Sequence, residues 1–304
     1  DYDCLVVCCD GLGSFITLRN ARIPTINLCF TPLRAVYDEA YRQRHLSRQG
    51  AFRPMATVLE AGYRALDRML WRRYDHIVAI SAAVKERIEQ GGLAQNKSIE
   101  INYPGIDFDE GRQAESYSQY FFLPGRIMWT KNIELGIRSF LRFKATVETP
   151  FRLIIAGMVD RKSEPYLAQL RNLVGDSPDI EFRHDLSDEQ MAGLYANCYA
   201  TLFTAFNEDL GLTPLEAATY CKASIAVDRG GPKETIVHEE TGLLVEPDDA
   251  SFCEAMRALA ADPDRTQKMG RAAQRFSGRF SWKSFVHKLD DSVERLTGPG
   301  SKPG

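Results

Sequence analysis

Short apolar runs alternate along the chain with longer segments whose apolar residues recur at helical spacing. This alternation is typical of parallel sheets wrapped by helices. The pattern predicts strands at 4–8, 25–30, 77–80, 98–102, 120–124, 152–156, 180–183, 200–203, 224–227 and 242–245. It predicts helices between them, for example at 82–89, 133–144, 165–173, 188–196 and 214–219.

A chain of 304 residues is longer than one typical core and predicts two domains. The segment 103–118 opens with Pro104-Gly105 after a predicted strand and then becomes polar and acidic, which is typical of a boundary. The strands downstream suffice for a complete doubly wound sheet. The four strands upstream predict an incomplete first domain, as if a preceding piece of that domain were absent from this chain. We therefore predict an α/β protein with a partial Rossmann-like domain at 1–110 and a complete one at 119–279.

Composition narrows the functional classes. The net charge of -3 provides no basic field for nucleic acid. No stretch approaches the roughly 18 apolar residues of a membrane-spanning helix. The seven cysteines form no CxxC pair and no ligand spacing for a metal, so we expect buried, reduced thiols and a cytoplasmic location.

The most informative segment, FNEDLGLTPLE, occupies residues 206–216. A predicted strand leads into a glycine-containing loop and then into a helix with Pro214 at its first position. Free N–H groups at such a helix start favour phosphate. Glu208 and Glu216 bracket the loop and can accept hydrogen bonds from sugar hydroxyls. Thr213 and Glu216 also fit a capping box, which needs no ligand, and both interpretations stay open.

Two further segments follow predicted strands. In PGRIMWTKN, residues 124–132, Arg126 and Lys131 can together neutralise a pyrophosphate, or they are solvated loop charges. In DRGGPKET, residues 228–235, the glycines allow backbone to lie close to a ligand, or they form an ordinary turn.

Together the three segments resemble the retaining glycosyltransferases of family 4, which have the two-domain GT-B fold. The family's motifs occur here in its order, with "GR…K" after the domain's first strand, Glu208 and Glu216 as an E-x7-E pair, and GGPKE…TGLLVEPDD at 230–249. The resemblance covers nearly the whole chain. It implies GT-B architecture and a closing helix at 280–297 that crosses back to the first domain, and we expect Trp282 to be buried near the domain junction.

The resemblance also implies roles for matching residues. Arg126 and Lys131 would hold the donor diphosphate, and Glu208 would contact the transferred hexose; these three are the candidate catalytic residues. Glu216 would accept hydrogen bonds from the ribose hydroxyls. The residues that follow 154–157 and those near 182–184 would line the pocket for the nucleotide base. The candidate donor-binding residues are Gly125, Asp209, Gly211, Leu212, Thr213 and Glu216. No metal or cofactor is implied, and the donor substrate would be a nucleotide sugar such as GDP- or UDP-hexose.

The expected function is therefore metal-independent transfer of a hexose, with mannose favoured, to a saccharide or lipid-linked acceptor in cell-surface polysaccharide assembly. Phe30 stands where the family has a histidine beside the donor sugar, and the family's glycine-rich loop has no counterpart, Gly11 and Gly13 being interpreted as a turn. These departures favour an alternative, a nucleotide-sugar-binding subunit impaired in catalysis. Separately, we expect another chain as a partner that supplies the missing N-terminal portion. A sugar-nucleotide epimerase is disfavoured, because the closing motifs match transferases better.

Residues 42–73 hold eight arginines against Glu60 and Asp67, and residues 56–73 have helical apolar spacing. The resemblance implies peripheral contact with the inner face of a membrane for such a segment. A solvated helical face is the alternative.

Overall fold

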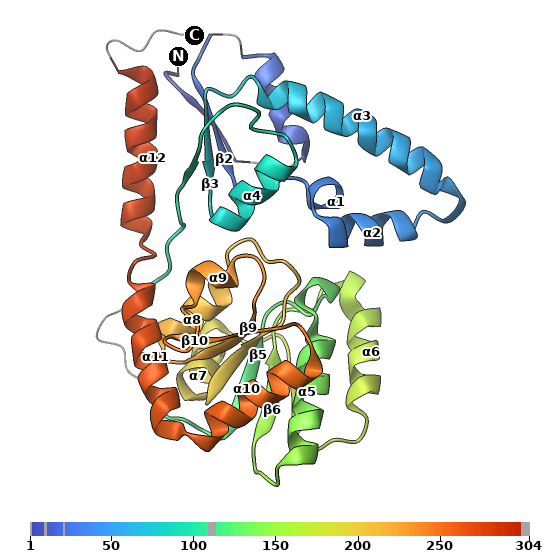
Figure 1. The fold of residues 1–304 in the computed structure, drawn as a ribbon, viewed down its shortest axis with the longest axis vertical. Helices are drawn as coiled ribbons and strands as arrows, with labels where there is room; N and C mark the ends of the chain where they lie inside the picture. The colour runs from blue at the N-terminus through green and yellow to red at the C-terminus, as the bar shows by residue number, and fades with distance from the viewer. Residues whose placement is uncertain (1, 9–10, 21, 109–113, 299–304) are drawn as a thin grey trace. The chain divides into compact units, whose positions relative to one another are not determined.

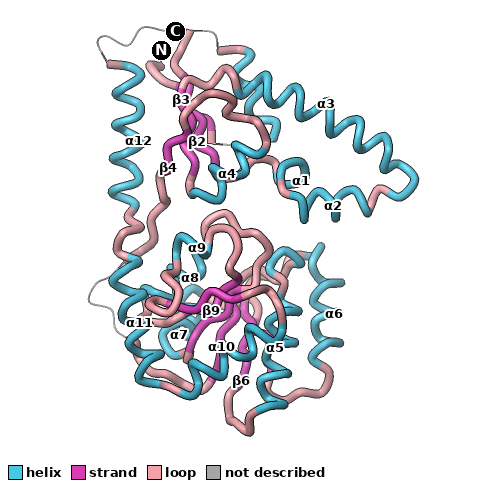
Figure 2. The backbone as a smooth tube through the Cα atoms, in the orientation of Figure 1, coloured by secondary structure: helices cyan, strands magenta, loops and turns pink. Residues whose placement is uncertain are grey.

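The computed structural model describes residues 2–8, 11–20, 22–108 and 114–298, and it divides into two compact units (Figure 1). The first unit comprises residues 1–105 with 280–304, and the second comprises residues 106–279. Each unit has its own parallel sheet, drawn in magenta in Figure 2.

The first unit contains four parallel strands in the order β1-β2-β3-β4, and all four lie where the sequence predicts them. The strands are β1 Leu5–Val7, β2 Thr25–Cys29, β3 His76–Ala79 and β4 Ile99–Ile101. The helices are α1 Arg34–Tyr37, α2 Glu39–Ser47, α3 Arg53–Trp71, α4 Ala82–Gln90 and α12 Trp282–Thr297, with 3-10 helices η1 Gly11–Leu18 and η2 Gly50–Phe52. The predicted turn at Gly11 and Gly13 is thus the start of a 3-10 helix.

Helix α12 packs beside the sheet of the first unit (Figure 1). The Asn102 side chain, just after β4, donates to the Phe285 carbonyl over 2.8 Å. Arg295 pairs with Glu100 of β4 at 2.8 Å. These contacts tie both halves of α12 to β4 and to the residue that follows it.

Trp282 begins α12 and is 48% exposed, so its predicted burial is wrong. The main chain of Trp282, rather than its side chain, lies close to Gly105. A Cβ added to Gly105 would lie 2.0 Å from the Trp282 nitrogen, so only glycine fits there. Phe285, one turn later, is the buried aromatic residue of this helix. Val286, which the helical spacing also assigns to the apolar face, is exposed as well, so the spacing does not show which residues near the helix start turn outward.

The second unit contains six parallel strands in the order β10-β9-β8-β5-β6-β7. The strands are β5 Tyr120–Pro124, β6 Arg152–Ala156, β7 Ile180–Arg183, β8 Ala200–Phe203, β9 Ser224–Val227 and β10 Gly242–Val245. The helices are α5 Ile133–Thr146, α6 Glu164–Val174, α7 Asp188–Asn197, α8 Leu212–Thr219, α9 Pro232–Thr235, α10 Asp249–Ala261 and α11 Pro263–Ser277, with 3-10 helices η3 Trp129–Lys131 and η4 Arg161–Ser163. All six strands were predicted, and their order is that of a doubly wound Rossmann sheet.

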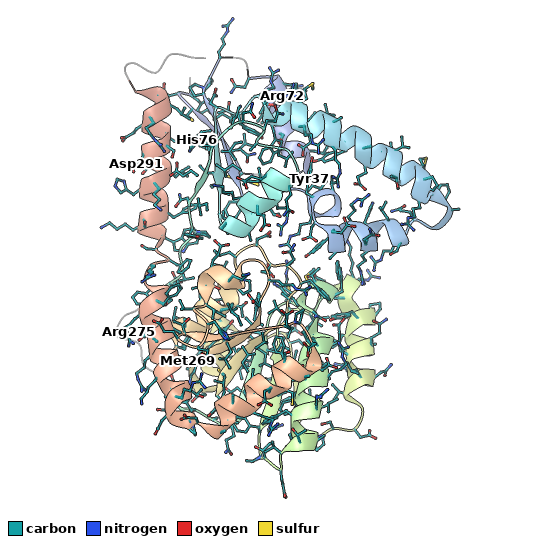
Figure 3. All side chains as sticks on the ribbon, viewed as in Figure 1. Tyr37, Arg72, His76, Met269, Arg275 and Asp291 are labelled. Carbon is teal, nitrogen blue, oxygen red and sulfur yellow. The ribbon has the colours of Figure 1, made fainter. Side chains whose placement is uncertain are left out.

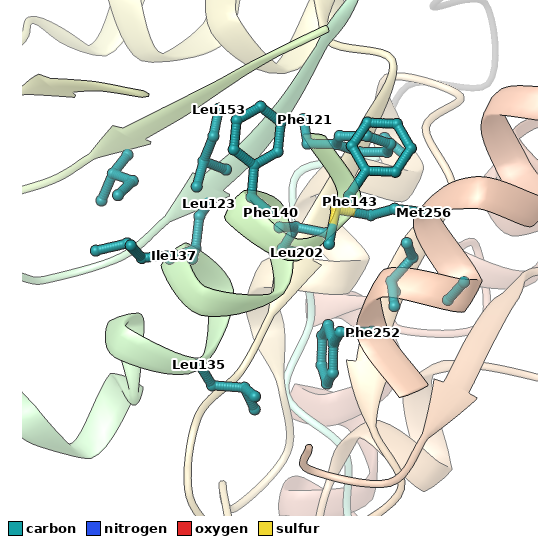
Figure 4. Close-up of a cluster of buried hydrophobic side chains, with 14 of the residues drawn as sticks. Phe121, Leu123, Leu135, Ile137, Phe140, Phe143, Leu153, Leu202, Phe252 and Met256 are labelled. Carbon is teal, nitrogen blue, oxygen red and sulfur yellow. The ribbon is translucent and has the colours of Figure 1, made fainter. Parts of the chain in front are cut away.

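The main core of the second unit lies where α5 and α10 cover the sheet (Figure 4). Phe121 of β5 is fully buried and meets Phe143 of α5 edge to face, at 5.7 Å between ring centroids. Phe252 and Met256 of α10 are also fully buried in this cluster. Burial of each such side chain contributes roughly 1.5–3 kcal/mol, so this cluster stabilises the packing of α5 and α10 against the sheet.

The arginine-rich segment 42–73 includes α3, which ends beside Arg72 (Figure 3). Five of its eight arginines bind other parts of the first unit. Arg42 and Arg64 bind Glu60, Arg64 also binds the Val36 carbonyl, Arg68 the Gly91 carbonyl, Arg72 the Gln95 side chain, and Arg73 the Thr17 carbonyl. The segment is therefore in large part a set of structural tethers.

Two smaller findings concern the cysteines and membrane spans. Cys29, Cys198, Cys221 and Cys253 are buried as expected, but Cys8 is exposed and Cys4 is half-buried. These two flank β1, a three-residue edge strand that leaves its ends uncovered. Cys9 lies outside the described residues. Among the helices of the described chain, none combines the length and the apolar character needed to cross a bilayer.

Candidate functional site

The strand order of the second unit locates a crevice. β5 lies between β6 and β8. The chain adds β6 and β7 on one side of β5 and then β8, β9 and β10 on the other, so a topological switch point lies between β5 and β8. In doubly wound sheets, ligands bind at this point, outside the carboxyl ends of the strands. The loops that follow β5 and β8 are the two segments with candidate chemistry.

The loop after β5 is held against the loop after β6. Gly125 has a φ of +138°, which favours glycine. A Cβ added to Gly157 would lie 2.1 Å from the Gly125 carbonyl oxygen, so the two backbones touch only because glycine stands there. The Ile127 amide donates to the Met158 carbonyl over 2.9 Å. The main chain around Arg126 is consequently well fixed.

Lys131 lies at the end of η3, and its carbonyl accepts a 2.7 Å hydrogen bond from the Thr204 hydroxyl after β8. Its Nζ atom lies 2.7 Å from Oε2 of Glu208, and both side chains are about one-fifth exposed (21% and 24%). The fold thus brings together a predicted cation and a predicted carboxylate that are far apart in the sequence. Such a partly exposed ion pair can exchange partners when an anion or a hydroxyl arrives.

Arg126 is exposed at the mouth of the same crevice. Within the part of the chain that the structure describes, its guanidinium makes no hydrogen bond and no ion pair. It therefore keeps its full set of donors for a ligand, in contrast to Lys131.

The glycines of the third segment support the loop after β8. The Gly231 amide donates to the Glu208 carbonyl over 2.8 Å. A Cβ added to Gly230 would lie 2.6 Å from that same carbonyl oxygen, and one added to Gly231 would lie 2.2 Å from the Leu210 Cα. These glycines therefore allow the third segment to lie close to the backbone of the loop after β8.

Helix α8 starts at Leu212, two residues earlier than predicted, and Pro214 is its third residue. Proline is tolerated there because the first four helical N–H groups have no partner within the helix. The N-cap is Gly211, with a φ of +82° and no side-chain cap. The capping-box interpretation of Thr213 and Glu216 is therefore wrong.

Glu216 points its carboxylate to Tyr195 of α7, whose hydroxyl donates to Oε2 over 2.7 Å. Glu216 is exposed, whereas Tyr195 is buried. Burial, reinforced by the Glu216 charge, raises the pKa of the Tyr195 phenol well above its ordinary value. Tyr195 is thus a permanent hydrogen-bond donor to this carboxylate.

A cavity of about 450 Å³ opens at the switch point. Of the predicted site residues, it is lined by Gly125, Arg126, Lys131, Thr213 and Glu216. Glu208 reaches this group through Lys131. Asp209 and Gly211, on the loop before α8, and Leu212, the first residue of α8, lie outside the cavity lining.

The rest of the lining is Pro124, Gly157, Met158, Asp185, Leu186, Met191 and Tyr195, none of which was among the named candidate residues. Gly157 and Met158 follow β6 and Asp185 follows β7, so the positions after strands carried a usable signal close to the expected base pocket. Met191 and Tyr195 lie in the middle of α7, and nothing in its helical pattern distinguished them from core residues. In the described ranges, no group of three or more His, Cys, Asp or Glu side chains has a metal-binding arrangement.

Comparison with known proteins gives a consistent result. A sequence model of the family "Glycosyl transferases group 1" matches residues 107–276, more than half of the chain. The alpha-1,3/1,6-mannosyltransferase ALG2 of Mus musculus is 34% identical over 191 residues, which are 59% of this chain and 46% of that protein. The O-antigen chain mannosyltransferase RfbU of Salmonella typhimurium is 25% identical over 228 residues, 73% of this chain and 62% of that protein. The chain thus spans about half of the length of these curated relatives.

Among solved structures, Anabaena HepE in complex with UDP has a TM-score of 0.72 at 19% identity, over 94% of this chain and 75% of that one. Likeness at this identity shows the fold, and it confirms the predicted α/β architecture of the GT-B type with two Rossmann-like sheets. The family match covers the motifs at Arg126, Lys131, Glu208 and Glu216 in their expected order. On this evidence the chain belongs to the glycosyl transferases group 1 family.

Proposed function

We propose that the chain transfers a hexose from a nucleoside-diphosphate sugar to a saccharide or lipid-linked saccharide, with retention of configuration and without a metal. The observation that carries the proposal is the cavity at the β5–β8 switch point, where Arg126, Lys131 and the start of α8 meet. Two cations and the free N–H groups of a helix start together suit a diphosphate.

The chemistry follows from charge. As the bond between the hexose C1 and the phosphate oxygen breaks, negative charge grows on the leaving diphosphate, and Arg126 and Lys131 offset it. Lys131 would then exchange Glu208 for the diphosphate, which frees Glu208 to accept from hexose hydroxyls. The acceptor oxygen attacks C1 on the same face, and its proton passes to the leaving phosphate oxygen.

The proposed donor is a GDP- or UDP-hexose, with mannose favoured, and the proposed acceptor belongs to glycan assembly. The names of two relatives support this choice, since both are mannosyltransferases and one acts on an O-antigen chain.

Binding of UDP, GDP and ADP tests the proposal directly. Calorimetric titration should detect at least one of them, and the same ligand should raise the melting temperature, because binding to the native state alone stabilises it. The affinity should stay the same in EDTA. Loss of binding in EDTA would contradict the metal-free site, and no binding of any nucleotide would contradict the function.

An impaired, nucleotide-sugar-binding subunit is the second candidate. Phe30, directly after β2, is 43% exposed and cannot hydrogen-bond a hexose as the family's histidine does. Hydrolysis of GDP-mannose and UDP-glucose by the purified chain separates the two. Slow release of nucleoside diphosphate indicates a competent centre, and binding without release indicates the impaired subunit.

We also propose peripheral contact of the first unit with an anionic bilayer on the cytoplasmic side. The support is an exposed apolar face around the start of α3, formed by Phe52, Met55, Val58 and Leu59. Exposed arginines at positions 48 and 53 adjoin it, and such a face combines apolar insertion with attraction to lipid headgroups. Flotation with phosphatidylcholine vesicles, with and without phosphatidylserine, measures this contact; equal flotation with both would contradict it.

A further inference from the structure

We infer that Tyr195 is a positioning residue, whose hydroxyl holds the Glu216 carboxylate in the orientation that receives the ribose hydroxyls of the nucleotide. The inference rests on the proposed function, because it takes the cavity beside α8 as the nucleotide site.

The ring of Tyr195 is clamped on two sides. Tyr220 stacks on it, with ring centroids 5.7 Å apart and planes at 7°. Phe122 of β5 meets it edge to face, at 5.1 Å and 78°. With 6% of its surface exposed, the ring has one accessible orientation, so its hydroxyl has one direction.

The choice of hydrogen-bond partner is informative. A buried phenol needs an acceptor, and a backbone carbonyl would satisfy it. Two nearby tyrosines do use carbonyls: Tyr120 donates to Leu194 over 2.8 Å, and Tyr199 donates to Leu259 over 2.7 Å. Tyr195 instead donates to an exposed carboxylate on the cavity wall. A charge-assisted bond of this kind is stronger and restricts an otherwise mobile side chain.

One carboxylate oxygen remains for the ligand. Oε2 of Glu216 accepts from Tyr195, and across the described residues the carboxylate makes no other hydrogen bond. A carboxylate has about four acceptor positions, so both ribose hydroxyls can be accommodated. The phenol thus fixes the plane in which the remaining acceptor positions lie.

The test is the affinity of Tyr195→Phe for UDP and GDP, each compared with its 2′,3′-dideoxy form. For the ribonucleotide that the unmodified chain binds, the dissociation constant should rise about three- to tenfold, the loss of one oriented hydrogen bond. For the dideoxy form it should change less than about twofold. Tyr199→Phe is the matched control, because it removes a buried phenol bond of the same length away from the cavity; it should leave both affinities unchanged.

A double-mutant cycle with Glu216→Ala separates positioning from direct contact. If Tyr195 acts through Glu216, Tyr195→Phe has no further effect in the Glu216→Ala background. A persisting effect, equal losses for ribo and dideoxy forms, or an unchanged affinity would each overturn the inference while leaving the proposed function intact. Absence of any nucleotide binding by the unmodified chain would overturn the proposed function and the inference with it.

Discussion

The arginine-rich segment of the first unit has eight arginines within residues 42–73, whereas the loop after β5 in the second unit has only Arg126 and Lys131 as cations. Five of the eight arginines bind backbone carbonyls or side chains of their own unit. Arg126 and Lys131 both line a cavity at the carboxyl ends of parallel strands. The density of charge along a sequence therefore says less about a binding site than the position of each charge relative to the sheet.

The physical reason lies in the guanidinium group. Its five donors match carbonyl oxygens at helix ends and loops, so a long helix with many arginines readily uses them as ties to neighbouring segments. Arg68, for example, reaches from α3 to the Gly91 carbonyl at the end of α4 over 2.9 Å. A cation at the end of a strand has fewer such partners and faces the crevice.

The largest effect is expected for Lys131→Ala. A hydrogen bond to a charged group contributes roughly 1.5–3 kcal/mol, so diphosphate binding should weaken at least about tenfold. Binding of the free nucleoside should stay nearly the same, since the lost charge faces phosphate. Calorimetry with UDP and uridine, or GDP and guanosine, measures both.

Arg138→Ala is the control for Lys131→Ala. Arg138 lies on α5 and pairs with Asp249 at 3.1 Å on the surface of the same unit. An exposed pair contributes about 0–1 kcal/mol to stability, and its loss should leave nucleotide affinity unchanged. Equal losses of affinity in the two variants would mean that general charge, rather than position at the strand end, governs binding.

The sequence predicted all ten strands because each is a short buried apolar run next to a turn signal. The site was predictable as far as it consists of residues in the segments between a strand and the next helix, such as Arg126 and Lys131. Tyr195 was not, because it lies within a helix and its role depends on the packing of α7 against α8. The start of α8 was misplaced because Pro214 was assigned to the first helical position, where proline is common, whereas it is the third residue of the helix.

The same limit applies to the arginines. Helical periodicity predicts which face of α3 is apolar, but the partners of Arg64 and Arg73 come from segments 28 and 56 residues away in the sequence. Local pattern contains no information on such long-range carbonyl contacts. The membrane interpretation of the segment began from eight arginines, but five of them bind other groups of the first unit.

Lys222 extends the comparison to a buried cation. It is fully buried, donates to the Ser116 carbonyl, and has its Nζ atom 3.7 Å from the centroid of the Tyr117 ring. Burial lowers the pKa of Lys222 to about 8, from 10.5. Between these values the unfolded chain binds more protons than the folded one, so this group makes stability rise with pH from about 8 to 10.5.

In Lys222→Met, that rise should be absent. The difference in unfolding free energy between the unmodified chain and the variant should change by about 3 kcal/mol over this interval, by the linkage of roughly 1.4 kcal/mol per pKa unit. Urea unfolding at several pH values measures it, with Lys97→Met as a less buried lysine for comparison. A constant difference across the interval would show that the ammonium is not destabilised by burial.

The smallest effects distinguish two arginines of the same helix. Arg64 binds Glu60 at 3.0 Å, so Arg64→Ala should lower the unfolding free energy by about 1 kcal/mol and the melting temperature accordingly. Arg53 is exposed at the start of α3, where a cation opposes the helix dipole, so Arg53→Ala should leave stability nearly unchanged.

Binding to phosphatidylserine vesicles should respond in the opposite order. A basic residue near an anionic surface contributes about 1 kcal/mol, so Arg53→Ala should weaken vesicle binding about fivefold, while folded Arg64→Ala should keep it. If Arg64→Ala weakened vesicle binding as much as Arg53→Ala, the division between tethers and surface charges would be wrong.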